Sequence, residues 1–460
     1  MKIFEDLIVN FSNWLWGLPL LILLLGGGVF FLFYSNFIPF KYFSHAVNVL
    51  RGKYDDPSDP GQINHYEALS TALAATVGMG NISGVAVAIT TGGPGAIFWM
   101  WVSAFFGIAT KFFTCTLSVM YRGKDTAGEI QGGPMYVIVE GLGKKWKPLA
   151  LFFSTAGLIG MLPIFQANQF TQIIRDVVLI PNGIAGTDQT NFITGIIITI
   201  IVSSVIFGGI KRIGKVAGKM VPLMVVLYFV SVGYIILVNY TSIIPSFEQI
   251  FADAFSGNAV LGGALGAIII AGARRAAFSN EAGIGTAPMA HGAAKTNEPI
   301  REGLVAMLGP AIDTLVVCTL TALAILITGT WQNTTDSGVT ITVNAFNQAI
   351  PGFGMYILVA CVTIFAMTSL FSYSYYGTKC FSFIAGAKNK RYFNYFYVAT
   401  IVFGAVASLK AIISLIDAAY ALMSIPTMVS AILLAPKVKR AAKKYFSKLE
   451  AEESEIKVSA

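Results

Sequence analysis

The sequence predicts an all-α membrane protein that crosses the bilayer eleven times. Its 460 residues are 55% hydrophobic and only 12% charged, and the mean hydropathy is +0.70, whereas soluble domains carry about 25% charged residues. A soluble chain of this length would lack the polar surface to cover itself. Apolar stretches of about 20 residues, each long enough for one crossing, recur along the chain. The composition also excludes disordered, collagen-like, coiled-coil and disulfide-stapled proteins.

The predicted spans follow one another with short polar connections. The first span is too long for the apolar part of a signal peptide, and no cleavage-site pattern follows it, so it is expected to remain as a helix. The spans are expected at 14–38, 66–91, 94–120, 148–178, 190–208, 219–240, 257–291 (interrupted), 304–329, 352–377, 393–409 and 411–435.

Basic residues gather on one side of these spans. If the N-terminus lies outside, most of the 31 Lys and Arg residues fall in segments on the cytoplasmic side and in the C-terminal tail. The opposite loops hold Asp188, Glu248, Asp253 and Asp336. The positive-inside rule therefore predicts a cell-membrane protein with its N-terminus outside and its C-terminus in the cytoplasm. This sorting explains the net charge of +8 without a nucleic-acid partner; the lipid bilayer is the expected surrounding.

Two halves of the chain resemble each other at an offset of about 205 residues. The pentapeptide Val-Gly-Met-Gly-Asn at 77–81 corresponds to Ala-Gly-Ile-Gly-Thr at 282–286. Since each half holds an odd number of spans, the second half must enter the membrane from the other side, which predicts an inverted repeat typical of secondary transporters. The expected domains are an N-terminal segment with one additional helix at 1–65, repeats at 66–240 and 257–435, and a basic cytoplasmic tail at 436–460.

The second predicted span contains two glycines, Gly78 and Gly80, on either side of Met79. Glycine costs about 1 kcal/mol inside a helix, so the helix is expected to unwind here. Unpaired backbone groups persist within a membrane only where they line a cavity or meet a ligand. The amides of Met79 and Gly80 could hold a carboxylate, and the carbonyls of Ala74 and Val77 could hold a cation. A close helix contact of the glycine-x-x-x-glycine type is the alternative.

The seventh predicted span is dense in polar side chains, namely Arg274, Arg275, Ser279, Asn280 and Glu281. An arginine at mid-bilayer costs ~3 kcal/mol, so this segment must face protein or water. Ser279 and Asn280 could bind substrate. Arg274, Arg275 and Glu281 are expected to form a buried ion-pair network or a gate. The alternative is that the whole stretch is a cytoplasmic loop.

The eighth predicted span carries Asp313 about nine residues from its start, at a depth of ~13 Å. A carboxylate inside the membrane is a functional candidate. Asp313 is expected either to pair with Arg274 or Arg275, or to tune a cation site.

Neutral oxygen and amide groups occur in two further spans. In the ninth, the carbonyl of Phe365 and the hydroxyls of Thr368 and Ser369 could hold an alkali cation weakly; hydroxyls that bond to their own helix are the alternative. In the fourth, Gln166 and Gln169 share one helix face and could reach a substrate. Hydrogen bonding from helix to helix is the alternative for these amides.

Metal or covalent chemistry is not indicated. The 4 cysteines have no C-x-x-C spacing and are expected to be small core residues. The 3 histidines are scattered along the sequence, which argues against a metalloenzyme. No cofactor is expected other than a coupling ion.

Two long motifs resemble a known family. They are Gly-Gly-Pro-Gly-Ala-Ile-Phe-Trp-Met-Trp at 92–101, and Phe-Ser-Asn-Glu-Ala-Gly at 278–283 followed by Gly-Thr-Ala-Pro at 285–288. Over nearly its whole length the chain resembles the alanine or glycine:cation symporter family. That family is similar in architecture to LeuT-type transporters, which have five-plus-five inverted repeats and broken first and sixth core helices. The second and seventh spans would be these broken helices, and 14–38 would be an additional N-terminal helix.

The resemblance also implies positions for the ligands. A substrate carboxylate would meet the amides of Met79 and Gly80. One sodium ion would lie among Ala74, Val77, Phe365, Thr368 and Ser369. A second sodium site would use Thr76 and Asn81, but its other ligands have no match in this sequence. The residues expected around the substrate are Thr76, Gly78, Met79, Gly80, Gln166, Gln169, Phe278, Ser279 and Asn280.

The predicted function is sodium-coupled import of a small neutral amino acid, alanine or glycine, by alternating access, with no enzymatic step. Three alternatives remain. Asp313 and Glu281 could instead support proton coupling. Glycine-rich breaks can also frame the filter of an ion channel. Asp313 and Glu281 could serve as the acid and base of an enzyme embedded in the membrane.

Overall fold

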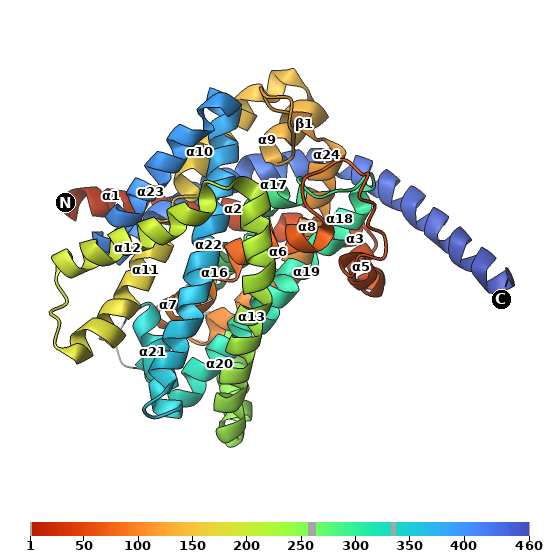
Figure 1. Cartoon of the computed structure of the whole chain (residues 1–460). Helices are drawn as coiled ribbons and strands as arrows, with labels where there is room; N and C mark the ends of the chain where they lie inside the picture. The colour runs from red at the N-terminus through yellow and green to blue at the C-terminus, as the bar shows by residue number, and fades with distance from the viewer. Residues whose placement is uncertain (1, 256–263, 333–336, 460) are drawn as a thin grey trace.

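The computed structural model is built almost entirely of helices and describes residues 2–255, 264–332 and 337–459 (Figure 1). The N-terminal elements are α1 (Lys2–Leu15), α2 (Leu18–Leu21), η1 (Ile22–Gly26), α3 (Gly27–Tyr34), α4 (Ile38–Lys41), α5 (Phe43–Leu50), α6 (His65–Thr76), η2 (Gly80–Gly84), α7 (Val85–Gly92) and α8 (Gly95–Met120).

The central elements include one antiparallel pair of two-residue strands, in which Gly123 pairs with Gln131. The elements are β1 (Gly123–Lys124), β2 (Ile130–Gln131), α9 (Pro134–Tyr136), η3 (Val137–Leu142), η4 (Lys144–Trp146), α10 (Lys147–Gly160), α11 (Ile164–Ile173), η5 (Ile174–Leu179), η6 (Ile180–Asn182), α12 (Asp188–Ile206), α13 (Gly209–Val238), η7 (Tyr240–Ser242) and α14 (Ile243–Ala254).

The C-terminal part ends in a long helix whose end projects away from the body of the molecule (Figure 1). The elements are α16 (Ala264–Asn280), α17 (Ala287–His291), α18 (Pro299–Ala306), α19 (Leu308–Pro310), η8 (Ala311–Cys318), α20 (Thr319–Thr328), η9 (Thr330–Gln332), α21 (Val339–Ala349), α22 (Gly354–Ala385), η10 (Ala387–Asn389), α23 (Lys390–Val406) and α24 (Leu409–Ser459). The predicted boundary between the second repeat and the tail, at 435, falls inside α24.

The molecule is a multi-pass membrane protein. Among the described residues, seven helical stretches are long and apolar enough to cross a bilayer, or nine if each of two bent pairs counts as one span. Length and composition therefore give fewer crossings than the predicted eleven. The predicted spans 257–291 and 393–409 fall at shorter helices, α16 and α23, each of 17 residues, and residues 257–263 lie outside the described residues.

The first predicted span, 14–38, differs from the structure in its course. Helix already begins at Lys2 in α1, and the chain bends by 49° between Leu15 and Leu18. Gly17 has an extended backbone (ψ −178°), and Pro19 stands in the first turn of α2. Because proline has no backbone N–H, Pro19 cannot donate a hydrogen bond to a carbonyl of the preceding turn. The helix predicted at 14–38 is therefore bent near its start.

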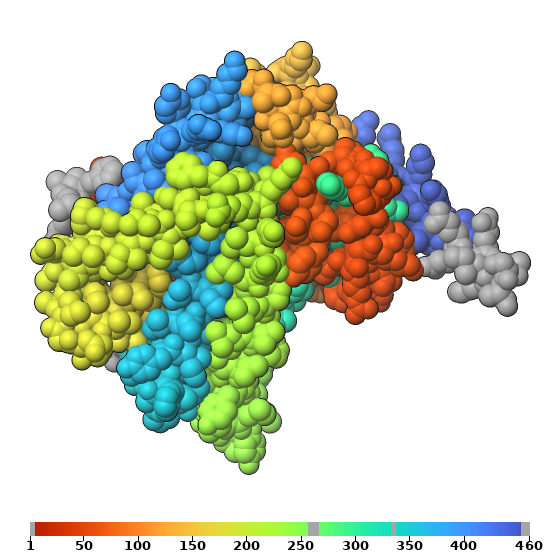
Figure 2. All heavy atoms as spheres, in the orientation of Figure 1, coloured from red at the N-terminus to blue at the C-terminus, as the bar shows by residue number. Residues whose placement is uncertain are grey.

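The outer helices present apolar side chains to the surroundings. Ile200 on α12 and Val230 on α13 are each 66% exposed, and Leu237 is 73% exposed. Figure 2 shows α12 and α13 on the outer face in view. Such exposure is costly in water but is required of a surface that contacts lipid tails. The polar interior is instead enclosed by α6, α8, α16 and α22.

Both predicted interruptions are confirmed. Helix α6 ends at Thr76, helix resumes at Gly80, and the two pieces are bent by 51°. Helix α16 ends at Asn280 and α17 begins at Ala287; between them Glu281, Gly283 and Gly285 all have positive φ (56°, 85° and 103°). Glycine adopts this region at little cost. Since 264–280 is helical, the alternative that the seventh segment is a loop is wrong.

Candidate substrate and cation site

At the first interruption, the Asn81 side chain accepts a hydrogen bond that a helix carbonyl would otherwise accept. The amide of Gly78 donates to Oδ1 of Asn81 at 2.9 Å. In a continuing helix this amide would donate to the carbonyl of Ala74. The final helical bond of α6 instead joins the Val77 amide to the carbonyl of Leu73, at 2.7 Å. The carbonyl of Ala74 therefore lacks its usual helical donor and is available to another partner.

The first interruption packs directly against α22. A Cβ atom placed on Gly78 would overlap the hydroxyl oxygen of Ser369 and would lie 3.6 Å from the carbonyl oxygen of Phe365. The Ser369 hydroxyl is buried and has no hydrogen-bond partner among the described residues. The neighbouring Thr368 hydroxyl donates to the carbonyls of Ile364 and Phe365 at 2.9 and 3.1 Å. Thr368 thus bonds to its own helix, which was the alternative to cation binding, whereas Ser369 does not.

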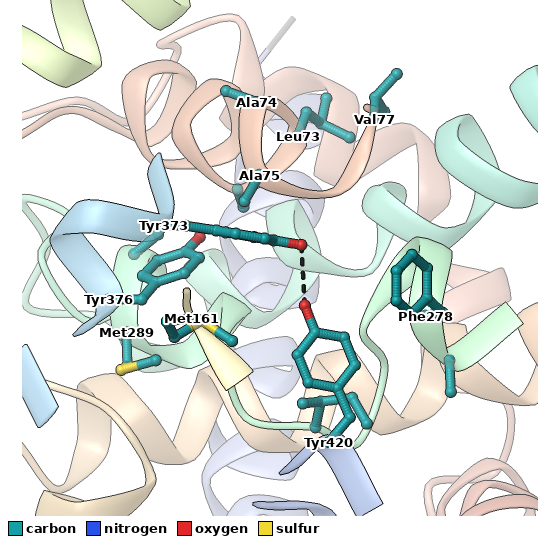
Figure 3. Packing of buried hydrophobic residues seen from close by; sticks show 14 of the residues in the cluster. Leu73, Ala74, Ala75, Val77, Met161, Phe278, Met289, Tyr373, Tyr376 and Tyr420 are labelled. Atoms are coloured by element: carbon teal, nitrogen blue, oxygen red, sulfur yellow. Dashed lines mark hydrogen bonds between the residues drawn. The ribbon is translucent and has the colours of Figure 1, made fainter. Parts of the chain in front are cut away.

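The two interrupted helices meet at Gly80. A Cβ atom placed there would lie 3.4 Å from Cδ1 of Phe278 and 3.4 Å from Cα of Ser279. The ring of Phe278 lies edge-on to that of Phe165, with centroids 4.9 Å apart, and 5.8 Å from that of Tyr420. Figure 3 shows Phe278 and Tyr420 beside the end of α6. Aromatic side chains therefore surround the point where the two helices approach.

Asp313 ties both interrupted helices to η8. Its Oδ1 accepts from Nδ2 of Asn81 at 2.8 Å, and its Oδ2 accepts from the hydroxyls of Ser279 and Thr314, each at 2.7 Å. Asn280 caps the second interruption, because its Oδ1 accepts from the Ala282 amide at 2.9 Å while its Nδ2 donates to Thr314. The polar groups of Ser279 and Asn280 are thus bonded within the protein.

The predicted pairing of Asp313 with Arg274 or Arg275 is wrong. Both arginines instead bind Asp417 on α24: Nε of Arg274 lies 2.7 Å from Oδ2 of Asp417, and Arg275 donates to the same oxygen. Arg274 and Arg275 lie about one turn before Ser279 in α16. Their side chains therefore reach α24 and not η8. They line a cavity of about 710 Å³ together with Asp417 and Trp16.

Glu281 also stays apart from the arginines, contrary to the predicted network. Its Oε1 accepts hydrogen bonds from the hydroxyls of Tyr373 at 2.6 Å and Tyr420 at 3.2 Å. The two tyrosine hydroxyls lie 2.9 Å from each other, as the dashed line in Figure 3 shows. The Oε2 atom of Glu281 is buried and forms no hydrogen bond with any residue that the structure describes.

The two predicted glutamines behave differently. Oε1 of Gln169 accepts from the Ser83 hydroxyl at 2.5 Å and from the Val339 amide at 3.1 Å, so this side chain connects helices as the alternative expected. Oε1 of Gln166 is buried and has no partner. Thr76 donates to its own helix, at the Ala72 carbonyl, 3.1 Å away. Gln166 is therefore the glutamine whose acceptor remains available.

Several polar residues of this region were missed. Lys111 on α8, Asp417 on α24 and the tyrosines 373 and 420 lie in apolar spans; the two charged residues carry the same signal that singled out Asp313. The histidines are scattered along the sequence, yet His65 and His291 both bind Glu302, His291 through Nδ1 at 2.5 Å. Nothing in the sequence spacing indicates this convergence. The 4 cysteines are buried, as expected.

Comparisons with known proteins agree with this architecture. The model of the Sodium:alanine symporter family matches residues 1–459. The Sodium/alanine symporter AgcS of Methanococcus maripaludis is 39% identical over 439 residues, covering 94% of this chain and 95% of the relative. The Amino-acid carrier protein AlsT of Bacillus subtilis is 32% identical over 437 residues, covering 95% and 90%.

A solved structure has the same fold. The crystal structure of MhsT in complex with L-phenylalanine superposes with a TM-score of 0.59 at 13% identity, and the match covers 83% of this chain and 98% of that one. This likeness shows that the two chains share a fold. Whole-chain coverage by the family model, together with relatives above 30% identity, establishes that this chain belongs to the Sodium:alanine symporter family, whose members are transporters and not enzymes.

Proposed function

We propose that this chain imports small neutral amino acids, alanine or glycine, together with sodium by alternating access. One contact carries the proposal. Gly80, beside the first interruption, packs against Phe278 and Ser279, which lie just before the second interruption. When cation and substrate stabilise one occluded state together, the downhill sodium gradient drives uphill uptake through differential affinity. The description of the Methanococcus relative as a sodium/alanine symporter supports this substrate and ion.

The proposed sodium site lies between α6 and α22. Its ligands are the carbonyls of Ala74, Val77 and Phe365 and the hydroxyls of Thr368 and Ser369. The unpartnered Ser369 hydroxyl beside Gly78 supports this position, as does the carbonyl of Ala74, which lost its helical donor. An alkali ion suits neutral oxygen ligands of this kind.

The proposed substrate site adjoins the sodium site. The amides of Met79 and Gly80 hold the substrate carboxylate at the start of the resumed helix, where the helix dipole is positive. The free acceptor of Gln166 is suited to the substrate ammonium. The rings of Phe278, Phe165 and Tyr420 occupy the space around the contact of the two helices, which favours a small substrate side chain.

The proposed topology follows from the fold and the charge pattern. We propose eleven crossings, with α16 and α23 completing the count, arranged as repeats at 66–240 and 257–435 after one additional N-terminal helix. The short length of α16 supports its role as half of a broken helix. The excess of basic residues in connecting segments supports a cytoplasmic C-terminus and an N-terminus outside.

The test is uptake of labelled alanine and glycine by the purified chain in proteoliposomes. An inward sodium gradient at equal pH on both sides is expected to drive accumulation above the external concentration. Replacement of sodium by choline is expected to abolish it. Equal accumulation in choline, or no accumulation of either amino acid, would overturn the proposal.

Proton coupling is the second candidate, because the buried carboxylates Glu281 and Asp313 lie at the two interruptions, and Oε2 of Glu281 has no partner. A proton gradient imposed in choline separates the two. Full uptake under that condition would favour protons as the coupling ion, whereas uptake that needs sodium at fixed pH would exclude them.

A further inference from the structure

In the described part of the chain, the core carboxylates Glu281 and Asp313 have no cationic hydrogen-bond partner. Glu281 and Asp313 are 1% and 0% exposed. Their hydrogen-bond donors are neutral: an asparagine amide, two hydroxyls and two phenols. Arg274 and Arg275 are both occupied by Asp417. Neutral donors stabilise a carboxylate without cancelling its charge, and a buried charge without compensation is costly.

Lys111 is placed to compensate this charge. It is 2% exposed and lies within the apolar helix α8. One turn before it, a Cβ atom placed on Gly107 would lie 2.9 Å from Cβ of Ala282, within the second interruption. Nζ of Lys111 itself would lie 3.1 Å from a Cβ atom on Gly309, four residues before Asp313. This face of α8 therefore meets both the second interruption and the segment that leads to Asp313.

The Lys111 ammonium has no close anion. Electrostatic interactions link it to Glu281 and to Asp313. Within the described residues, however, it forms neither a hydrogen bond nor an ion pair within 4.0 Å. Oε2 of Glu281 is likewise without a hydrogen-bond partner. One buried lysine and two buried carboxylates thus share one region of the core, while Arg274 and Arg275 are paired with Asp417.

We propose that Lys111 is the resident counter-charge of Glu281 and Asp313. The proposal rests on the proposed function, because its first test is sodium-driven alanine uptake. It makes Lys111 a positioning residue, which keeps the carboxylates ionised and the interruptions in place without binding substrate.

A charge-pair cycle in proteoliposomes tests the role of Lys111. Lys111→Met is expected to lower sodium-driven alanine uptake by about tenfold or more, since it leaves buried carboxylates uncompensated. Lys111→Arg is expected to retain much of the uptake. Adding Glu281→Gln to Lys111→Met removes one excess negative charge and is expected to raise uptake above that of Lys111→Met alone. Normal transport by Lys111→Met, or a double variant no better than the single one, would overturn the proposal.

The matched control is Lys379, another buried lysine, on α22. Its Nζ donates to the carbonyls of Met289 at 2.8 Å and Gly132 at 3.3 Å. Glu281→Gln is therefore expected to give no rescue of Lys379→Met. Rescue of both lysine variants alike would show a general effect of Glu281→Gln and would also overturn the proposal.

Thermal unfolding separates this proposal from the transport assignment. The unfolding temperature of the purified double variant is expected to exceed that of Lys111→Met, even if Lys111→Met does not fold well enough for transport assays. An equal or lower value contradicts the pairing. If the wild type shows no sodium-driven uptake, the proposed function fails while the unfolding cycle still tests the charge pair.

Discussion

Asn81 joins the first interrupted helix to Asp313 while it keeps that helix open. Its Nδ2 donates to Oδ1 of Asp313 at 2.8 Å, and its own Oδ1 accepts from the Gly78 amide at 2.9 Å. The other oxygen of Asp313 accepts from Ser279, just before the second interruption. A single carboxylate therefore fixes the relative position of both broken helices.

Asn81→Ala is expected to destabilise the protein and to lower uptake. The change removes a donor from a buried carboxylate and an acceptor from the Gly78 amide, and each unsatisfied buried group costs about 1–3 kcal/mol. Thermal unfolding and alanine uptake measure the two effects. Asn81→Asp is expected to be worse than Asn81→Ala, because it places a second carboxylate against Asp313. A milder effect of Asn81→Asp would contradict the assigned contacts.

Gly78→Ala is expected to reduce uptake strongly, because its Cβ atom would overlap the Ser369 hydroxyl. Gly84→Ala is the matched control, since a Cβ atom there meets only Cδ1 of Phe278, at 3.8 Å. Uptake by both variants, normalised to the amount of reconstituted protein, checks the prediction. Equal activity of the two variants would show that Gly78 does not approach α22 as described.

Ser369→Ala is expected to raise the sodium concentration for half-maximal uptake about five- to tenfold, equivalent to roughly 1–1.4 kcal/mol. The hydroxyl lost is buried and has no hydrogen-bond partner in the described part of the chain. The control is Ser374→Ala on the same helix, because that hydroxyl donates to the Phe371 carbonyl at 2.7 Å. A similar shift in both variants would remove the evidence for a sodium ligand at Ser369.

Thr368→Ala is expected to weaken sodium dependence more than the preference between alanine and glycine. The Thr368 hydroxyl donates to carbonyls of its own helix, and these bonds leave its oxygen free to coordinate an ion. Sodium titrations with each amino acid measure the two effects. An unchanged sodium affinity would refute the role of Thr368 as a ligand.

Asp417→Asn is expected to lower the unfolding temperature, because two arginines lose their shared carboxylate. Truncating one partner of a buried ion pair costs about 3–5 kcal/mol. Adding Arg275→Gln removes one excess positive charge and is expected to restore part of the loss. The prediction fails if the double variant unfolds at the same temperature as Asp417→Asn or below it.

The interruptions were predictable because glycine acts locally. Gly78, Gly80, Gly283 and Gly285 weaken the helix wherever it packs, and both breaks occur where these residues cluster. The bend after α1 was not predicted, although Gly17 and Pro19 both disfavour a continuous helix there. The same short-range signals thus predicted the breaks in the second and seventh segments but went unused in the first.

The side-chain partners could not be predicted, because they depend on how distant helices pack. Arg274 and Asp313 appeared suited to pair, yet Asp417, 143 residues from Arg274, lies closer in space. Lys111 and Asp417 were equally visible as charges in apolar spans. Only the packing of α8 and α24 against α16 decides which of these charges meet.

The most direct test of the interrupted-helix site is binding of labelled alanine to the purified chain in detergent, at equal ionic strength in sodium and in choline. Saturable binding in sodium, its absence in choline, and a parallel loss in Gly78→Ala but not in Gly84→Ala are the predicted results. Binding of equal affinity in both salts, or undiminished binding by Gly78→Ala, would contradict a joint substrate and cation site at the first interruption.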